Sequence, residues 1–245
     1  MVRLVAEKLT RKCERITGSR MYGTDIHNTE LQGIIPRAAK KIFDYAKSSE
    51  LDIEFKVKCS MVEIYKENLR DLFANEQHKL KIKENPKQGI YIEDLSELYV
   101  VSEEEMAECL AFGNEMRHVA STRLNEYSSR SHAIFICEVT QKFPNESEKI
   151  GTLNLVDLAG SEKVSKSGAQ GLALEEAIKI NSSLTALGKV IQALSSGADH
   201  VPYRDSKLTR ILQESLGGNY KTSLIVNCSM HEDSIEETVS TLRFA

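Results

Sequence analysis

The chain has 245 residues, of which 41% are hydrophobic and 28% charged, with a formal net charge of −4. This length and composition suit one α/β domain with a sizeable core, and the sequence has neither a long uninterrupted apolar run nor a signal-peptide core, so we expect a soluble, intracellular protein. The negative balance argues against bulk attraction to nucleic acid or to an anionic membrane.

The first third of the chain alternates between expected helices and strands. Residues 1–16 form a charged segment compatible with a helix. After Pro36, apolar residues at helical spacing predict a helix, and the alternating run from Ile53 to Met61 predicts a strand. Short apolar runs at residues 79–84, 89–94 and 97–101 predict small strands.

The remaining two thirds begin with a helix whose start is clear. Ser102 and Glu105 have the spacing of a capping box, which predicts a helix to about His118. Strands are expected at 132–143, 149–158 and 222–229, the second being a candidate for the centre of the sheet because its end is almost continuously apolar. Helices are expected at 172–196, the longest, at 205–216, and from near Ser234. This alternation predicts an α/β fold with a mixed central sheet sandwiched by helices.

Cysteine usage indicates neither a disulfide framework nor a zinc site. The five cysteines are spread singly, without paired spacing, so we expect reduced and mostly buried thiols. Three histidines, His118, His200 and His231, stand alone and are interpreted as ordinary surface or core residues.

An acidic turn follows the expected strand at 149–158. Asp157 stands at its carboxyl end, Gly160 follows, and Glu162 comes next but one. Phosphate-transferring enzymes place a magnesium-side carboxylate and a backbone amide near a terminal phosphate in this way. Taken alone, Asp-x-x-Gly is weak, and a plain strand-to-turn junction is the simpler interpretation.

A polar loop precedes the expected strand at 132–143. Hydroxyl, guanidinium and amide groups concentrated in eight residues could ligate Mg²⁺, orient a water molecule and pair with a carboxylate. A solvated connection is the alternative. The residues concerned are Asn125, Ser128, Ser129, Arg130, Ser131 and His132.

Together, the loop NEYSSRSH and the segment LVDLAGSE resemble the switch I and switch II motifs of kinesins. The resemblance runs from about residue 21 to the end, is nearest to conventional kinesin, and includes GIIPR at 33–37, INSSLTALGKVIQAL at 180–194, VPYRDSKLTRILQESLGGN at 201–219 and STLRFA at 240–245. It implies a partial kinesin motor domain at 21–245, of the P-loop NTPase fold, after a non-family segment at 1–20.

The resemblance implies roles for individual residues toward ATP and Mg²⁺. Ser129 would ligate Mg²⁺, Asp157 would hold it through water, Ser128 would position the attacking water, and Gly160 would donate its amide to the γ-phosphate. Arg130 and Glu162 would form the ion pair that closes the site, Asn125 would join the nucleotide-binding residues, and Asn181 would link the long helix to switch II.

The resemblance also implies microtubules as the partner. Tubulin is acidic, so the matching face should be locally basic and its contacts sensitive to salt. Lys83 and Lys87 are weaker candidates for this face. The implied contact residues are Lys163, Lys166, Tyr203, Arg204, Lys207 and Arg210.

One expected motif is missing from residues 1–245. No Gly-x-x-x-x-Gly-Lys-Ser/Thr loop occurs, and the segment before residue 21 contains only Thr17-Gly18-Ser19. We therefore expect impaired ATP binding, a clipped motor, and an unpaired sheet edge where central strands are missing. The last helix is still running at Ala245, which would leave the neck linker, and any dimerisation, to other regions of the parent protein.

Three functions are compatible with these segments. The first is a microtubule-stimulated ATPase motor, cytoplasmic and microtubule-associated, without nucleic-acid or membrane partners. The second is a nucleotide-independent microtubule-binding protein; retention of the switch residues favours the first. The third, another P-loop enzyme such as a myosin, is disfavoured by the segments at 180–194 and 201–219.

Overall fold

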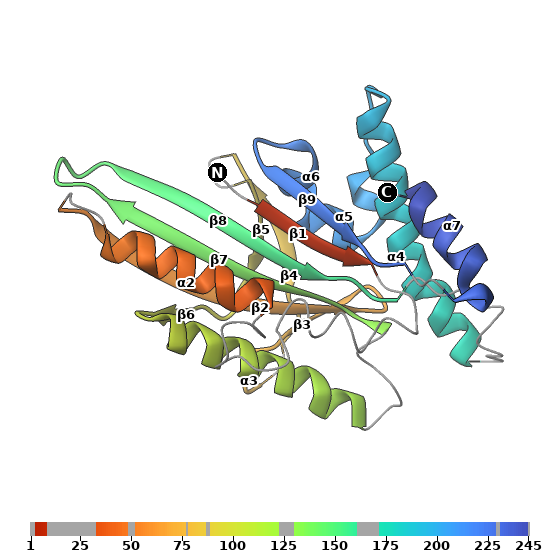
Figure 1. Ribbon diagram of the computed structural model, residues 1–245, viewed down its shortest axis with the longest axis horizontal. Helices are drawn as coiled ribbons and strands as arrows, with labels where there is room; N and C mark the ends of the chain where they lie inside the picture. The colour runs from red at the N-terminus through yellow and green to blue at the C-terminus, as the bar shows by residue number, and fades with distance from the viewer. Residues whose placement is uncertain are drawn as a thin grey trace.

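The computed structural model describes residues 3–8, 33–48, 52–76, 78–86, 89–122, 130–160, 172–228 and 231–244. Its centre is a seven-stranded sheet in the order β3-β2-β7-β8-β1-β9, with β6 also paired to β2 (Figure 1). The strands are β1 (Arg3–Lys8), β2 (Glu54–Tyr65), β3 (Asn68–Asp71), β6 (Leu98–Val100), β7 (His132–Lys142), β8 (Glu148–Asp157) and β9 (Lys221–Val226).

The sheet is mixed, as the alternation of elements predicts. β2, β7 and β8 run antiparallel to one another, whereas β1 runs parallel to both β8 and β9. β8 lies inside the sheet between β7 and β1, which confirms its expected central place.

The start of the chain differs from the expectation. Residues Arg3–Lys8 form β1 rather than a helix, and β1 fills the position between β8 and β9. β1 therefore supplies a central strand where central strands were expected to be missing. Among the described strands, β3 and β9 form the two ends of the main order.

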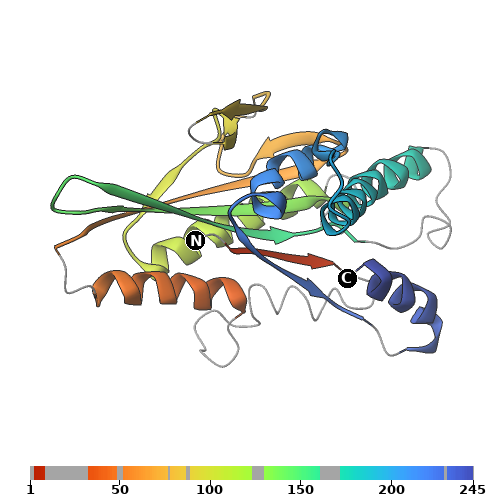
Figure 2. The ribbon, with the colours of Figure 1, turned by 90° about the horizontal axis from the view of Figure 1, so that it is seen from above.

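Helices cover both faces of the sheet, and strand alternation decides which side chains meet them. On one face, α2 (Ile34–Lys47) and α3 (Glu103–Thr122) pack over Val57, Cys59 and Met61 of β2. On the other face, α4 (Leu172–Ser195) and α5 (Lys207–Ile211) pack over Val62 and Ile64 (Figure 2). The helix–sheet–helix arrangement is thus confirmed.

Local sequence explains the two helices on the first face. In α2, Pro36 lies in the first turn, where a missing N–H costs nothing, and Ile35, Ala39 and Phe43 form one buried stripe. In α3, Ser102 Oγ accepts a hydrogen bond from the Glu105 amide at 3.2 Å. The Glu105 carboxylate accepts from the Val101 amide at 2.9 Å, so the capping box is present in modified form.

Residue Gly113 brings α3 close to the sheet. A Cβ at this position would overlap Met61 Sδ of β2. The helix continues to Thr122, four residues beyond the expected end. Its inner stripe reaches from Leu110 through Gly113 to Arg117, which is 4% exposed.

The C-terminal third surrounds α4, the longest helix among the described residues. The single helix expected at 205–216 is divided into α5 and α6 (Gln213–Gly217), because the backbone of buried Leu212 closes the first and opens the second. A 3-10 turn, η3 (Tyr203–Asp205), precedes α5, and η4 (Glu232–Ser234) precedes α7 (Ile235–Phe244). None of the described helices has the length and apolar character needed to cross a bilayer.

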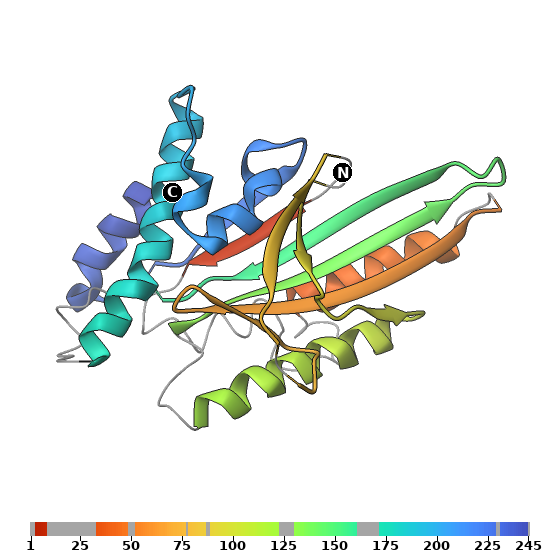
Figure 3. The ribbon, with the colours of Figure 1, turned by 180° about the vertical axis from the view of Figure 1, so that it is seen from behind.

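A separate hairpin packs beside α5 and α6. It consists of β4 (Lys81–Asn85) and β5 (Gly89–Glu93), which cross in front of the main sheet in Figure 3 and stand apart from it in Figure 2. Leu80 and Ile92 join it to the hydrophobic cluster that contains Leu208 and Leu212 of the α5–α6 region.

The described cysteines are all free. Cys59 and Cys137 are fully buried and stand opposite each other in the β2–β7 register. A hydrogen bond with Cys137 and burial raise the pKa of Cys59 well above its usual range. Cys109 is half-buried and Cys228 exposed, so the expectation of reduced thiols holds for these four, and that of burial for only part of them.

Candidate functional site

The two polar segments singled out in the sequence meet at one edge of the sheet. Ala133 at the start of β7 pairs with Asp157 at the end of β8. Because β7 begins where β8 ends, the residues before β7 and after β8 must be neighbours. His132 Nδ1 accepts a hydrogen bond from the Ala159 amide at 2.9 Å, which joins them directly.

His132 also reaches the longest helix. Its Nε2 lies 2.7 Å from Ser183 Oγ of α4. Since Nδ1 accepts from the Ala159 amide, the neutral ring carries its proton on Nε2 and donates it to Ser183. Burial, with a contribution from the positive charge of Arg117, lowers the pKa of His132 to about 3. This imidazole is therefore a neutral connector between the loop after β8 and α4.

A buried network of charges lies next to His132, and we call Glu63, Arg117, Ser131 and Asp157 the switch cluster. Arg117 Nη1 contacts Asp157 Oδ2 at 2.6 Å, and its Nη2 donates to the Ser131 carbonyl at 2.8 Å. Ser131 Oγ donates to Glu63 Oε1 at 2.7 Å. Arg117 Nε lies 3.3 Å from Ser131 Oγ and 3.7 Å from Glu63 Oε1.

The charged side chains of the switch cluster are largely removed from water. The side chains of Glu63 and Arg117 are 0% and 5% exposed, and that of Asp157 is 20% exposed. Arg70 Nη1 lies 3.6 Å from Glu63 Oε2, but that oxygen has no hydrogen-bond partner among the described residues. Two carboxylates thus share the buried guanidinium of Arg117, with Arg70 at the outer oxygen of Glu63, and the buried charges can be kept only because they are paired.

The sequence-predicted switch residues are only partly within the described residues. Asp157 and buried Gly160 lie at the end of β8, and Arg130 is half-buried just before β7. Asn181 is half-buried on α4, and Ser183 of the same helix contacts His132 at this edge. The predicted residues Asn125, Ser128, Ser129, Glu162, Lys163 and Lys166 fall outside the described residues, and so does the Arg130–Glu162 pair.

Three residues of this edge were not predicted, namely Glu63, Arg117 and Ser183. Two of them, Glu63 and Arg117, had a detectable signal, because each is a polar residue inside an apolar pattern. Glu63 interrupts the run from Met61 to Ile64, and Arg117 continues the buried stripe of α3. A buried polar residue needs a partner, so such interruptions indicate a network.

The segment at residues 201–213, which we call the 201–213 segment, lies beside α4. Leu208 and Leu212 are buried against Leu184 and Leu187 of α4. Ser206 Oγ accepts from the Thr209 amide at 3.1 Å. These bonds hold the backbone while Arg204 is exposed and Tyr203 and Lys207 are half-buried.

Arg210 of this segment has an intramolecular partner. Its Nη2 lies 2.6 Å from Glu84 Oε2 of β4, and its Nη1 donates to Gln213 Oε1 at 2.5 Å. Arg210 therefore fastens the β4–β5 hairpin to α5. Lys83 of the same hairpin pairs with Glu93 at 2.9 Å, and Lys87 lies outside the described residues.

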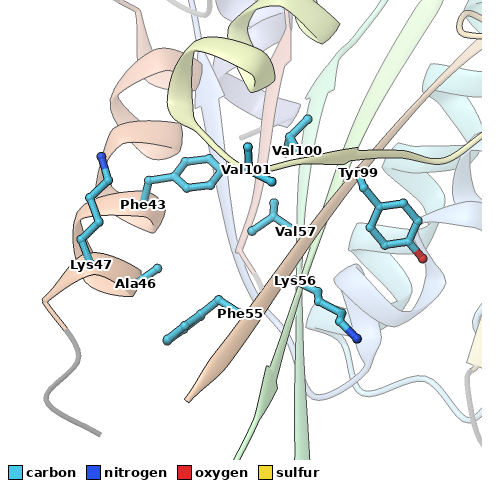
Figure 4. Close-up of a pocket in the computed structure, with 9 residues that line it drawn as sticks. All are labelled: Phe43, Ala46, Lys47, Phe55, Lys56, Val57, Tyr99, Val100 and Val101. Carbon is cyan, nitrogen blue, oxygen red and sulfur yellow. The ribbon is translucent and has the colours of Figure 1, made fainter. Parts of the chain in front are cut away.

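A pocket of about 340 Å³ lies at the opposite end of β2 (Figure 4). It opens between α2, the start of β2, and β6, and its wall is apolar except at Lys47, Lys56 and Tyr99. The switch cluster contacts β2 at Glu63, near the other end of that strand. The pocket is therefore separate from the edge that the sequence motifs mark.

The sequence-family model that describes the kinesin motor domain matches residues 17–245 of the chain. This chain belongs to the kinesin motor domain family. Kinesin-related protein 5 of Dictyostelium discoideum is 53% identical over 230 residues, which are 93% of this chain and 23% of that protein. Human kinesin-1 heavy chain is 47% identical over 220 residues, 89% of this chain and 23% of its own length.

A solved kinesin structure agrees with this family. A fast kinesin, described for its ATPase mechanism and interactions with microtubules, superimposes with a TM-score of 0.90 and 50% identity, over 99% of this chain and 68% of that one. The kinesin-type P-loop NTPase fold is thus confirmed. The chain spans about a quarter of the length of each of the two kinesins named above.

Proposed function

We propose that this chain is the switch and microtubule-binding portion of a motor that couples ATP hydrolysis to movement along microtubules. The observation that carries the proposal is the pair of bonds made by His132, to the Ala159 amide and to Ser183 of α4. A change in the loop after β8 would thereby act on α4, which packs against the 201–213 segment.

The proposed nucleotide-binding residues are Asn125, Ser129, Asp157 and Gly160, with Mg²⁺ held by Ser129 and, through water, by Asp157. Mg²⁺ would neutralise phosphate charge there. Among the described residues, Asp157 suits the role of the carboxylate on the magnesium side, since it ends a buried strand close to buried Gly160. Arg117 orients that carboxylate through Oδ2. Ser128 would position water, and Arg130 and Glu162 would close the site.

The proposed microtubule face is basic and lies on the 201–213 segment and the loop after β8. Cations there would meet acidic tubulin, so we propose a microtubule-associated location in the cytoplasm. Arg210 would act in part by holding the β4–β5 hairpin, given its bond to Glu84. The proposed contact residues are Lys163, Lys166, Tyr203, Arg204, Lys207 and Arg210.

Microtubule co-pelleting tests this proposal. We expect the chain to bind microtubules and the binding to weaken with added salt. Arg204→Glu should weaken it at least fivefold, whereas Lys41→Glu should not, because exposed Lys41 lies on α2 across the sheet from α5. Equal binding by the two variants, or no binding by the parent chain, would contradict the proposed surface.

A nucleotide-independent microtubule binder is the second candidate. It is favoured by one observation, that residues 1–245 contain no Gly-x-x-x-x-Gly-Lys-Ser/Thr. Adding a non-hydrolysable ATP analogue to the co-pelleting assay distinguishes the two. For this chain we expect no response to the analogue, and restoration of the response when a complete phosphate loop is grafted before residue 21 would favour the motor.

A further inference from the structure

The turn between β2 and β3 has an unusual backbone for its residues. Tyr65 and Asn68 pair across it, so Lys66 and Glu67 form a two-residue loop. Their φ angles are 50° and 60°, in the left-handed region. Asn-Gly is the pair that suits such a turn, whereas two long side chains are strained there. Lys66 and Glu67 therefore make the folded protein less stable than glycine would at these two positions.

The carboxylate of Glu67 reaches across the molecule to the 201–213 segment. Its Oε2 accepts a hydrogen bond from the backbone amide of Lys207, the first residue of α5, at 2.7 Å. The two residues are 140 positions apart in the sequence. The other oxygen, Oε1, is buried without a hydrogen-bond partner among the described residues. Glycine would relieve both this burial and the backbone strain, but would lose the bond to Lys207.

The β2–β3 hairpin that contains Glu67 also contains Glu63, a member of the switch cluster. Glu63 lies four residues before Glu67 and accepts the hydroxyl of Ser131. One short stretch of β2 and its turn therefore contacts both the edge containing Asp157 and the segment containing Lys207.

We propose that Glu67 is a positioning residue for microtubule binding. It fixes the start of α5 to the central sheet, so that Arg204 and Lys207 are presented in one orientation. This inference rests on the proposed function, because it assigns to Glu67 the placement of the surface that meets tubulin. A strained residue that holds a binding surface trades stability for function.

Two glycine substitutions separate this role from a general effect on folding. Glu67→Gly and Lys66→Gly each remove one non-glycine residue from a positive φ, but only the first removes the carboxylate. We expect neither variant to melt at a lower temperature than the parent chain. Glu67→Gly should bind microtubules about fivefold to tenfold more weakly, because the start of α5 would occupy the binding orientation only part of the time. Lys66→Gly should bind like the parent, and Glu67→Gln, which keeps an acceptor, should recover most of the affinity.

Hydrogen exchange supplies a readout that does not need microtubules. The Lys207 amide should lose protection in Glu67→Gly and keep it in Lys66→Gly. Equal microtubule affinity for the two glycine variants, or a loss that merely follows a lower melting temperature, would overturn the positioning role. Should the parent chain fail to bind while Lys207 protection still depends on Glu67, the proposed function fails and Glu67 is left as a structural cap only.

Discussion

The switch cluster and the 201–213 segment use the same kinds of side chain in opposite surroundings. Arg117 is 5% exposed and shared between two carboxylates. Arg210 is 17% exposed, and its partner Glu84 is 53% exposed. A charge pair that cannot be hydrated depends wholly on its partner, whereas water can replace the partner of an exposed charge. Substitutions of charged residues should therefore cost much stability in the switch cluster and little in the 201–213 segment.

The largest effect is expected at Arg117. Arg117→Met should destabilise the protein by about 3–5 kcal/mol, because fully buried Glu63 and partly buried Asp157 would lose the cation that they share. Urea unfolding measures this difference. Adding Glu63→Gln to Arg117→Met should recover part of the loss, since one of the uncompensated carboxylates is then removed.

An exposed ion pair provides the matched control for Arg117. Lys40 Nζ lies 4.0 Å from Glu103 Oε1, with side chains 52% and 31% exposed. Lys40→Met should change the free energy of unfolding by no more than about 0.5 kcal/mol. If Arg117→Met cost no more than Lys40→Met, burial would not govern the switch cluster and the contrast between the two regions would be lost.

The next effect is a pH dependence carried by His132. Its folded pKa of about 3 lies below the ordinary value of 6.5, so below pH 6.5 the unfolded chain binds a proton that the folded chain does not. The free energy of unfolding should therefore be complete above pH 6.5 and fall by about 1.4 kcal/mol per pH unit as pH decreases toward 3. Thermal and urea unfolding between pH 7 and pH 5 would measure it, above the range in which most carboxylates titrate.

Two substitutions test whether His132 causes this pH dependence of the free energy of unfolding. His132→Gln removes the titrating group and should flatten the profile, at the cost of lower stability at pH 7. His200→Gln changes an exposed histidine and should leave the slope as it is. A slope that survives His132→Gln would show that another group carries the proton.

Much of the fold and half of the switch region could be predicted from sequence. Periodicity located β7, β8 and α4, and Asp157 and Gly160 could be placed because they end an apolar strand. The contacts of Arg117 with Asp157 and Ser131 could not be predicted, because spacing along one element does not say which side chains meet across several elements. Tertiary pairing also overrode local preference at Arg3–Lys8, where β8 and β9 make a strand of a segment rich in helix-forming residues.

The smallest effect is expected at the Arg210–Glu84 pair, and it sharpens the comparison through salt. Glu84→Gln should cost about 0.2–1 kcal/mol at low ionic strength, because a half-exposed carboxylate gains little from its partner. In 0.5 M NaCl this cost should shrink toward zero, while the cost of Arg117→Met should stay nearly constant, since mobile ions screen only charges they can approach. Urea unfolding of both variants at two salt concentrations makes the measurement. A salt-independent cost for Glu84→Gln would mean that the β4–β5 hairpin is held to α5 by buried contacts such as Ile92, rather than by charge.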